Sequence, residues 1–338
     1  METQGRARPS PALFLETATA FERSAALNAA VELDLFTAIG DRAVSAAEAA
    51  AACGASERGA RILCDFLTVW GFLRKDDGAY RLTPDSAAFL DRHSPTYLGA
   101  ALEFLQARRA REGFWSLADA VRREQPADTA GFTSTADPVW PVFARTMMPI
   151  MIGPARRLAE VVEVDPDRPL RVLDIGAGHG MFGITLARRY PRAEVAALDW
   201  PEVLEVAEEN ARNEGVRERY TFLPGSAFET DLGAGYDLVL LTNLLVLFDR
   251  AADVRLLRRV HAALAEGGRA LSVQFMPDED RVSPPGPAAF ALTMLALTPS
   301  GDAYTFGEME AMFRAAGFSR SERRSLDPAP QSLAIAHR

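Results

Sequence analysis

The sequence has few of the residues that build disulfide networks and metal centres. Only two of its 338 residues are cysteine, Cys53 and Cys64, and only four are histidine. Two cysteines cannot form a disulfide network, and neither lies at a spacing typical of metal ligands. We therefore expect no metal site, and we expect a reducing, cytoplasmic environment.

The sequence also lacks an excess of basic residues and a long apolar run. Its formal net charge is −9 and its pI is about 5.2, whereas nucleic-acid binding relies on basic surfaces. No apolar run is long enough to span a bilayer, and the first residues lack the apolar core of a signal peptide. We therefore expect neither nucleic acid nor a membrane as a partner.

What is present is the composition of an ordinary globular protein, with 48% hydrophobic and 25% charged residues. A chain of 338 residues usually folds as more than one domain. The residue pattern changes along the chain and predicts three segments. These are a mainly helical domain over 11–95, a helical linker and pocket region over 96–165, and an α/β domain over 166–338. Pro138, Pro141, Pro149 and Pro154 are expected to break the middle segment into short pieces.

The first segment reads as helices followed by a hairpin. Ser45-Ala-Ala-Glu48 is a capping box that opens one helix, and Ser56 caps the next, over 57–70. Asp77-Gly78 between two short apolar runs predicts a β-hairpin. This order is that of a winged helix.

A winged helix can bind DNA or serve as a structural or dimerisation module. The helix predicted over 57–70 offers only Arg58 and Arg61 to phosphates, and phosphate contacts dominate DNA affinity. The structural or dimerisation role is therefore favoured.

From residue 169 onward, short apolar strands alternate with helices. Strands are predicted over 170–175, 193–198, 220–223, 236–242, 269–275, 319–325 and 332–337, and helices over 180–190, 202–213, 250–265 and 307–316. Gly267-Gly268 is expected to stop the helix over 250–265. This alternation predicts an α/β fold with a Rossmann-like, doubly wound and mostly parallel sheet.

The stretch Val172-Leu-Asp-Ile-Gly-Ala-Gly-His-Gly180 has the pattern of a nucleotide-binding turn. Gly176 and Gly178 permit a sharp turn and a close approach of ligand, and Gly180 lets the next helix pack on the strand. Asp199 ends the following strand, where an acceptor for ribose hydroxyls is expected. The turn is shorter than the G-x-G-x-x-G pattern of dinucleotide sites and lies in mid-chain, which favours S-adenosylmethionine over NAD.

Residues from about 20 to 338 resemble the two-domain small-molecule O-methyltransferases, the caffeate O-methyltransferase type and its bacterial secondary-metabolite relatives. The motifs that carry the resemblance are 172–180, Asp199-Trp200-Pro201, 225–228, 240–245, Leu256-Leu257 with 262–268, and 301–305 before 315–318. The resemblance implies a class I methyltransferase fold, S-adenosylmethionine as cofactor, and a homodimer formed through an N-terminal winged-helix dimerisation domain.

The resemblance also implies which residues form the sites. The expected cofactor-binding residues are Asp174, Gly176, Gly178, Gly180, Asp199, Trp200, Ser226, Ala227, Phe228 and Asn243. The family has an aspartate at the position of Ser226, so this adenine contact is weakened or replaced. An apolar substrate pocket is expected from Phe104, Trp115, Trp140, Phe143, Met147, Met148, Met151, Val246, Leu247 and Met294.

The sequence departs from the family at the catalytic positions. A histidine after N-L-L acts there as general base on a phenol, and this position is Val246 here. The two acids that support the base correspond to Gln274 and Ala303. The catalytic residues are therefore unknown, and the weak candidates are Tyr304, Asp302, Asn243, Gln274 and Glu103.

Two histidines lie near these motifs. His179 is part of the glycine turn and can face the cleft, although a structural role is favoured. His261 lies in the middle of a predicted helix and is expected to be structural.

These observations favour a methyltransferase for a small apolar or aromatic substrate, which acts by proximity and orientation, with O-methylation slightly favoured over C- or N-methylation. An enzyme that keeps the cofactor but performs pericyclic, decarboxylating or hydroxylating chemistry is the alternative. A winged-helix regulator that senses S-adenosylmethionine is disfavoured by the acidic charge.

Overall fold

The computed structural model describes residues 9–126 and 138–338, which form two compact units that divide between Leu102 and Glu103. Of the helical region expected over 96–165, residues 127–137 lie outside the described part. No helix in the two described ranges is long and apolar enough to cross a membrane.

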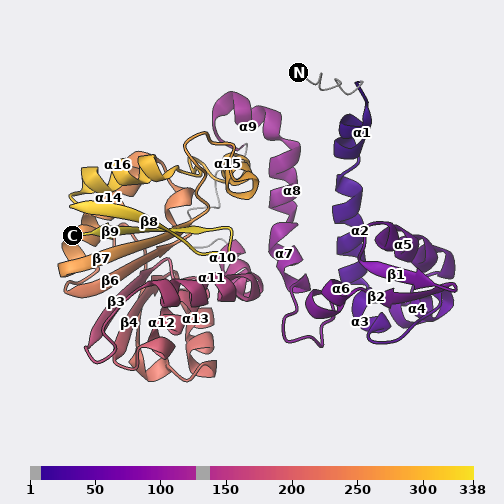
Figure 1. Ribbon diagram of the computed structural model, residues 1–338, viewed down its shortest axis with the longest axis horizontal. Helices are drawn as coiled ribbons and strands as arrows, with labels where there is room; N and C mark the ends of the chain where they lie inside the picture. The colour runs from indigo at the N-terminus through magenta and orange to yellow at the C-terminus, as the bar shows by residue number, and fades with distance from the viewer. Residues whose placement is uncertain (1–8, 127–137) are drawn as a thin grey trace, which may run out of the picture. The chain divides into compact units, whose positions relative to one another are not determined.

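The first unit is mainly helical (Figure 1). Its elements are α1 (Ala12–Ala18), α2 (Phe21–Glu32), α3 (Leu35–Ile39), α4 (Ala46–Cys53), α5 (Glu57–Val69), β1 (Leu73–Asp76), β2 (Ala79–Leu82), α6 (Pro84–Phe89) and η1 (Gly99–Ala101). The predicted capping box is confirmed, because Ser45 and Glu48 each accept a hydrogen bond from the other's backbone N–H. The predicted hairpin is also confirmed, with Asp76 paired to Ala79 across Asp77-Gly78.

The core of this unit lies between helices α2, α3, α4 and α5, with α3 and α5 packed on the hairpin. Phe36, Leu67 and Tyr80 are among its fully buried side chains. Helix α1 contributes nothing to this core, because none of its residues is buried. Its Leu13 and Phe14 are 77% and 72% exposed, so α1 presents apolar surface that its own unit does not cover.

The second unit contains a seven-stranded sheet and the helices around it. Its helices are α7 (Leu102–Leu105), α8 (Arg108–Trp115), α9 (Leu117–Arg123), α10 (Val139–Thr146), α11 (Met148–Val161), α12 (Met181–Arg189), α13 (Pro201–Asn213), η2 (Arg217–Arg219), η3 (Leu245–Leu247), α14 (Arg250–Ala263), α15 (Pro285–Leu297) and α16 (Phe306–Ala316). Its strands are β3 (Leu170–Ile175), β4 (Ala193–Asp199), β5 (Tyr220–Pro224), β6 (Tyr236–Thr242), β7 (Leu264–Gln274), β8 (Arg320–Ser325) and β9 (Ser332–His337).

The strand order is β5-β4-β3-β6-β7-β9-β8, with β9 antiparallel to both of its neighbours and the other pairs parallel. Helices α11, α12 and α13 cover one face, and α14 and α16 cover the other (Figure 1). The prediction of a doubly wound, mostly parallel sheet is confirmed. The chain runs outward from β3 through β4 to β5, and then returns to the other side of β3 with β6, so the strand order reverses between β3 and β6. Ligands bind at such points in open α/β sheets.

Two local predictions were wrong. The helix expected to run to residue 265 and stop at Gly267-Gly268 ends at Ala263, and β7 begins at Leu264. Leu264 pairs with Tyr236, and a register irregularity before Leu238 takes up Gly267, whose φ is 74°. Pro154 was expected to break the chain into shorter pieces, but α11 continues through it.

Candidate functional site

The glycine turn connects β3 to α12 at the point where the strand order reverses. Gly176, Gly178 and Gly180 all have positive φ, at 67°, 56° and 75°. Gly176 N–H donates to the carbonyl oxygen of Leu198, at the end of β4, over 2.8 Å. A Cβ atom at Gly176 would lie 3.0 Å from the Leu244 side chain. The turn therefore requires glycine for its backbone angles and, at Gly176, for space.

Asp199 closes the turn from the neighbouring strand. Its Oδ2 accepts a hydrogen bond from Gly178 N–H at 2.8 Å, and its Oδ1 accepts one from Trp200 N–H at 2.7 Å. Burial raises the pKa of this carboxyl to about 6, although both N–H donors act to lower it. The two hydrogen bonds orient the carboxyl group next to the turn.

A cavity of about 660 Å³ opens beside this turn, and all of its lining residues belong to the second unit. Eight of the expected cofactor residues line it, namely Gly176, Gly178, Asp199, Trp200, Ser226, Ala227, Phe228 and Asn243. The other two, Asp174 and Gly180, do not line it. Asp174 is fully buried, and burial raises its pKa to about 7. A Cβ atom at Gly180 would lie 3.2 Å from Ala207 Cβ on α13.

The same cavity continues into an apolar wall. Eight of the residues expected for the substrate pocket line it, namely Phe104, Trp140, Phe143, Met147, Met151, Val246, Leu247 and Met294. Phe143 packs edge-to-face with Phe104, at 5.0 Å between ring centroids. Met148 and Trp115 are not among the lining residues, and Trp115 is 77% exposed. Trp115 ends α8, where its neighbour Phe114 lines the cavity, and Met148 begins α11, where Ile150 and Met151 line it.

Sequence reasoning missed much of the wall that α8 and α15 provide. Further lining residues are Arg109 and Phe114 on α8, Phe290, Thr293 and Leu297 on α15, and Phe275 and Arg255. The apolar run 288–297 was a usable signal for α15, although only Met294 in it was singled out. The Phe275 and Phe290 rings stack at 4.3 Å between centroids and join α15 to the end of β7.

The position expected for a general base faces the cavity but carries no base. Val246 lies in η3 and is buried against the cavity. Gln274 is buried and uses its Nε2 to donate to Ser272 Oγ at 2.8 Å, and Ala303 is fully buried. Among the described residues that line the cavity, Asp199 is the one carboxylate and there is no histidine.

Comparison with known proteins places this geometry in a family. Residues 116–319 match the family model of the O-methyltransferase domain, and residues 15–92 match that of the O-methyltransferase dimerisation domain. The 3-hydroxy-5-methyl-1-naphthoate 3-O-methyltransferase of Streptomyces sahachiroi is 30% identical over 91% of this chain and 90% of its own. The chain belongs to the O-methyltransferase family.

Two solved structures agree with this assignment. A protein of Nostoc punctiforme PCC 73102, assigned as an O-methyltransferase, is 49% identical and superposes with a TM-score of 0.94, covering 98% of this chain and all of its own. PigF, solved with S-adenosylhomocysteine, is 25% identical and has a TM-score of 0.86, covering 98% of this chain and all of its own. The enzyme is a methyltransferase that uses S-adenosylmethionine.

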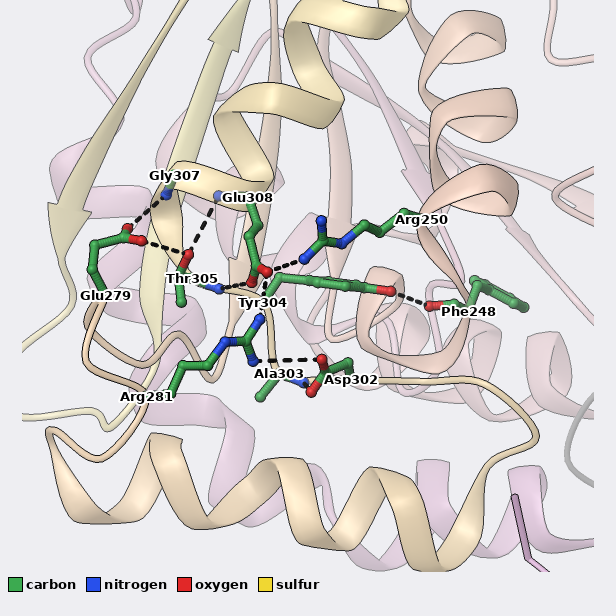
Figure 2. Close-up of polar contacts among 10 residues, drawn as sticks. All are labelled: Phe248, Arg250, Glu279, Arg281, Asp302, Ala303, Tyr304, Thr305, Gly307 and Glu308. Atoms are coloured by element: carbon green, nitrogen blue, oxygen red, sulfur yellow. Dashed lines mark hydrogen bonds and ion pairs between the residues drawn. The ribbon is translucent and has the colours of Figure 1, made fainter. Parts of the chain in front are cut away.

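Two of the weak catalytic candidates have structural partners in this O-methyltransferase. Figure 2 shows the Tyr304 hydroxyl donating to the carbonyl oxygen of Phe248, at 2.7 Å, and burial raises the pKa of Tyr304. Asp302 pairs with Arg281 at 3.5 Å. Neither residue lines the cavity, and neither does Glu103, which is exposed.

These two residues border a larger network that holds the loops around α16 together. Glu308, in the first turn of α16, accepts hydrogen bonds from both Arg250 and Arg281 (Figure 2). Glu279 accepts from Thr305 Oγ1 at 2.9 Å and from a backbone N–H of α16 at 2.8 Å. This network joins the start of α14, the segment that leads to α15, and the start of α16.

Both histidines near the motifs are engaged in packing. His179 Nδ1 accepts a hydrogen bond from Met181 N–H at 3.1 Å, and burial lowers its pKa to about 4. His179 is buried and does not line the cavity. The ring of His261 packs edge-to-face on Phe318, at 5.2 Å between centroids.

Proposed function

We propose that this enzyme methylates a small apolar or aromatic acceptor by holding it in line with the cofactor, without a histidine base. The observation that carries this proposal is the cavity of about 660 Å³, whose described lining is mostly apolar and has Val246 at the base position. O-methylation is favoured over C- or N-methylation.

The cofactor end of the cavity is assigned to the glycine turn and the ends of β4 and β5. Asp199 would accept hydrogen bonds from the ribose hydroxyls, and Gly176 and Gly178 would contact the methionine part. Ser226 and Phe228 would contact the adenine. Ser226 Oγ already accepts a hydrogen bond from Phe228 N–H at 3.2 Å, so Ser226 shapes this loop although it lacks the carboxylate found in relatives.

When bound, S-adenosylmethionine supplies a sulfonium methyl group, and transfer of this group to a nucleophilic atom leaves S-adenosylhomocysteine. The protein's part is to exclude water and orient the acceptor. Orientation lowers such a barrier by roughly 7–11 kcal/mol. A general base lowers it by about 3–5 kcal/mol, which corresponds to a rate gain of about 10²–10⁴-fold. Loss of the base is therefore tolerable when the acceptor is already ionised or strongly nucleophilic.

The acceptor class follows from this comparison. Enols, carboxylates, acidic phenols, amines and electron-rich carbons meet the requirement, whereas an ordinary phenol with a pKa of about 10 does not. Named relatives span both oxygen and carbon acceptors, since one acts on a hydroxynaphthoate oxygen and another is an L-tyrosine C(3)-methyltransferase of Streptomyces lavendulae, 25% identical to this chain.

We also propose that the protein works as a homodimer joined through the first unit, with segment boundaries at 11–95, 96–165 and 166–338. The matched dimerisation domain and the exposed apolar side chains of α1 support this assembly. Sedimentation measurements on the full chain test it, and a stable monomer at micromolar concentration would exclude it.

The methyl-transfer proposal is tested with a series of phenols of graded acidity. The rate of S-adenosylhomocysteine formation is expected to rise steeply as the phenol pKa falls toward the assay pH, because the ionised fraction grows, and to level off once the pKa lies below that pH. A rate that is insensitive to phenol acidity, or activity confined to unactivated catechols, would contradict a mechanism without a base.

A further inference from the structure

Asn243 occupies the junction between the glycine turn and the apolar wall. It follows the last residue of β6, has a φ of 52°, and donates its backbone N–H to the carbonyl oxygen of Val273 at 2.7 Å. The next residue, Leu244, packs against Gly176. A left-handed backbone is uncommon outside glycine, and asparagine is among the residues that tolerate it. The conformation is therefore held in place from both sides.

The two ends of the Asn243 amide have different surroundings. Its Nδ2 contacts Met151 Sδ on α11 at 3.9 Å, and Gln331 Nε2 lies 3.8 Å from the same sulfur. Its Oδ1 is buried and has no hydrogen-bond partner among the described residues. A buried acceptor without a partner is destabilising because it has lost its hydrogen bonds to water, and such groups in native proteins call for an explanation. Because Asn243 lines the cavity, a ligand can supply the missing donor.

We propose that Asn243 Oδ1 accepts a hydrogen bond from an O–H or N–H group that the methyl acceptor carries next to its nucleophilic atom. This inference rests on the proposed function. The preferred acceptor is then an acidic phenol or enol with a neighbouring hydroxyl or amino group. An amide oxygen does not remove a proton near neutral pH, so Asn243 is a positioning residue. The nucleophilic oxygen enters ionised, and the neighbouring donor fixes its direction.

The contacts of Asn243 favour the acceptor over the cofactor as the source of the donor. Its amide lies against Met151 of α11, which belongs to the apolar wall together with Met147 and Phe143. The carboxylate expected to meet cofactor hydroxyls, Asp199, lies at the end of β4, with β3 between it and β6.

The experiment compares two probes that differ in one donor. 4-Nitrocatechol carries a hydroxyl next to its acidic phenol, and 4-nitroguaiacol carries a methoxy group there. Their binding is measured by absorbance titration in the presence of S-adenosylhomocysteine, so no turnover is needed. The wild-type enzyme is expected to bind 4-nitrocatechol about 10-fold more tightly.

Three variants make the test specific. Asn243→Gly keeps the left-handed backbone and removes the oxygen, so the preference is expected to fall to about 1-fold. Asn243→Asp keeps an acceptor oxygen and is expected to retain the preference. Asn213→Gly, at the exposed end of α13, is the matched control and is expected to behave as wild type. Thermal unfolding verifies that each variant is folded.

The outcomes separate this inference from the function on which it rests. An equal preference in wild type and Asn243→Gly would overturn the role of Asn243. A loss of S-adenosylhomocysteine affinity in Asn243→Gly without a change in probe preference would show that the oxygen faces the cofactor, and would also overturn it. Failure of the wild type to bind S-adenosylhomocysteine at all would instead refute the proposed function.

Discussion

Asp253 is a buried acid beside the cavity whose replacement by asparagine is expected to stabilise the enzyme. It lies in the first turn of α14, is fully buried, and neither carboxyl oxygen has a hydrogen-bond partner among the described residues. Burial, reinforced by the nearby charge of Asp249, raises the pKa of this carboxyl from 3.8 to about 9. Its helical neighbours Ala252 and Arg255 line the cavity, but Asp253 does not. Its raised pKa would suit a general base, but Asp253 does not face the cavity and so cannot reach the methyl acceptor.

The size of the effect follows from the two pKa values. The folded state keeps a proton that the unfolded state releases above pH 3.8. The free energy of unfolding therefore falls as pH rises through the window from about 4 to 9, by about 1.4 kcal/mol per pH unit. At pH 7 the accumulated cost is about 4 kcal/mol. The Asp253→Asn variant would carry no such cost, and its amide would be no worse paired than the neutral acid it replaces.

The assay is urea unfolding of wild type and Asp253→Asn at pH 5, 6, 7 and 8. The variant is expected to be more stable, by a margin that grows by about 1.4 kcal/mol per pH unit. Methyl transfer and S-adenosylhomocysteine binding are expected to be unchanged. A margin independent of pH would refute the raised pKa, and a loss of turnover with unchanged cofactor binding would give Asp253 a catalytic role.

Three further predictions concern the site and its supports. S-adenosylhomocysteine affinity is expected to fall up to tenfold per pH unit below about pH 6, because protonation of Asp199 removes its charge. Calorimetry measures this fall, and an equal dependence of affinity on pH in Asp199→Asn would contradict the role of Asp199. The double variant Val246→His with Ala303→Glu is expected to raise kcat on an unactivated phenol about 10- to 100-fold. On 4-nitrophenol, which is already ionised, it is expected to change kcat little. An equal change on both phenols would contradict the claim that the wild-type enzyme lacks a general base. Glu308→Gln is expected to lower the free energy of unfolding by about 1 kcal/mol by weakening two ion pairs, and an unchanged urea midpoint would show that these pairs contribute nothing.

Local sequence determined the parts of this protein that depend on backbone geometry and short-range capping. The glycines of 172–180 predicted the turn because glycine adopts the left-handed conformations found at 176, 178 and 180 without strain. Ser45, Glu48 and Asp77-Gly78 predicted a cap and a hairpin for similar reasons. Asp199 was found because parallel strands end at the same edge of a sheet.

Tertiary structure alone decided which side chains form the cavity wall and how they point. Helix amphipathicity does not say which of Met147 and Met148, or of Phe114 and Trp115, faces the cavity, because this depends on how α8, α10 and α11 pack. Strand pairing with Tyr236, not the glycines at 267 and 268, ended α14. The sequence likewise does not reveal that the Asn243 oxygen lacks a partner among the described residues, or that the carboxyl of Asp253 is buried. Burial and hydrogen-bond satisfaction depend on residues distant in the chain, and only the packed fold brings these together.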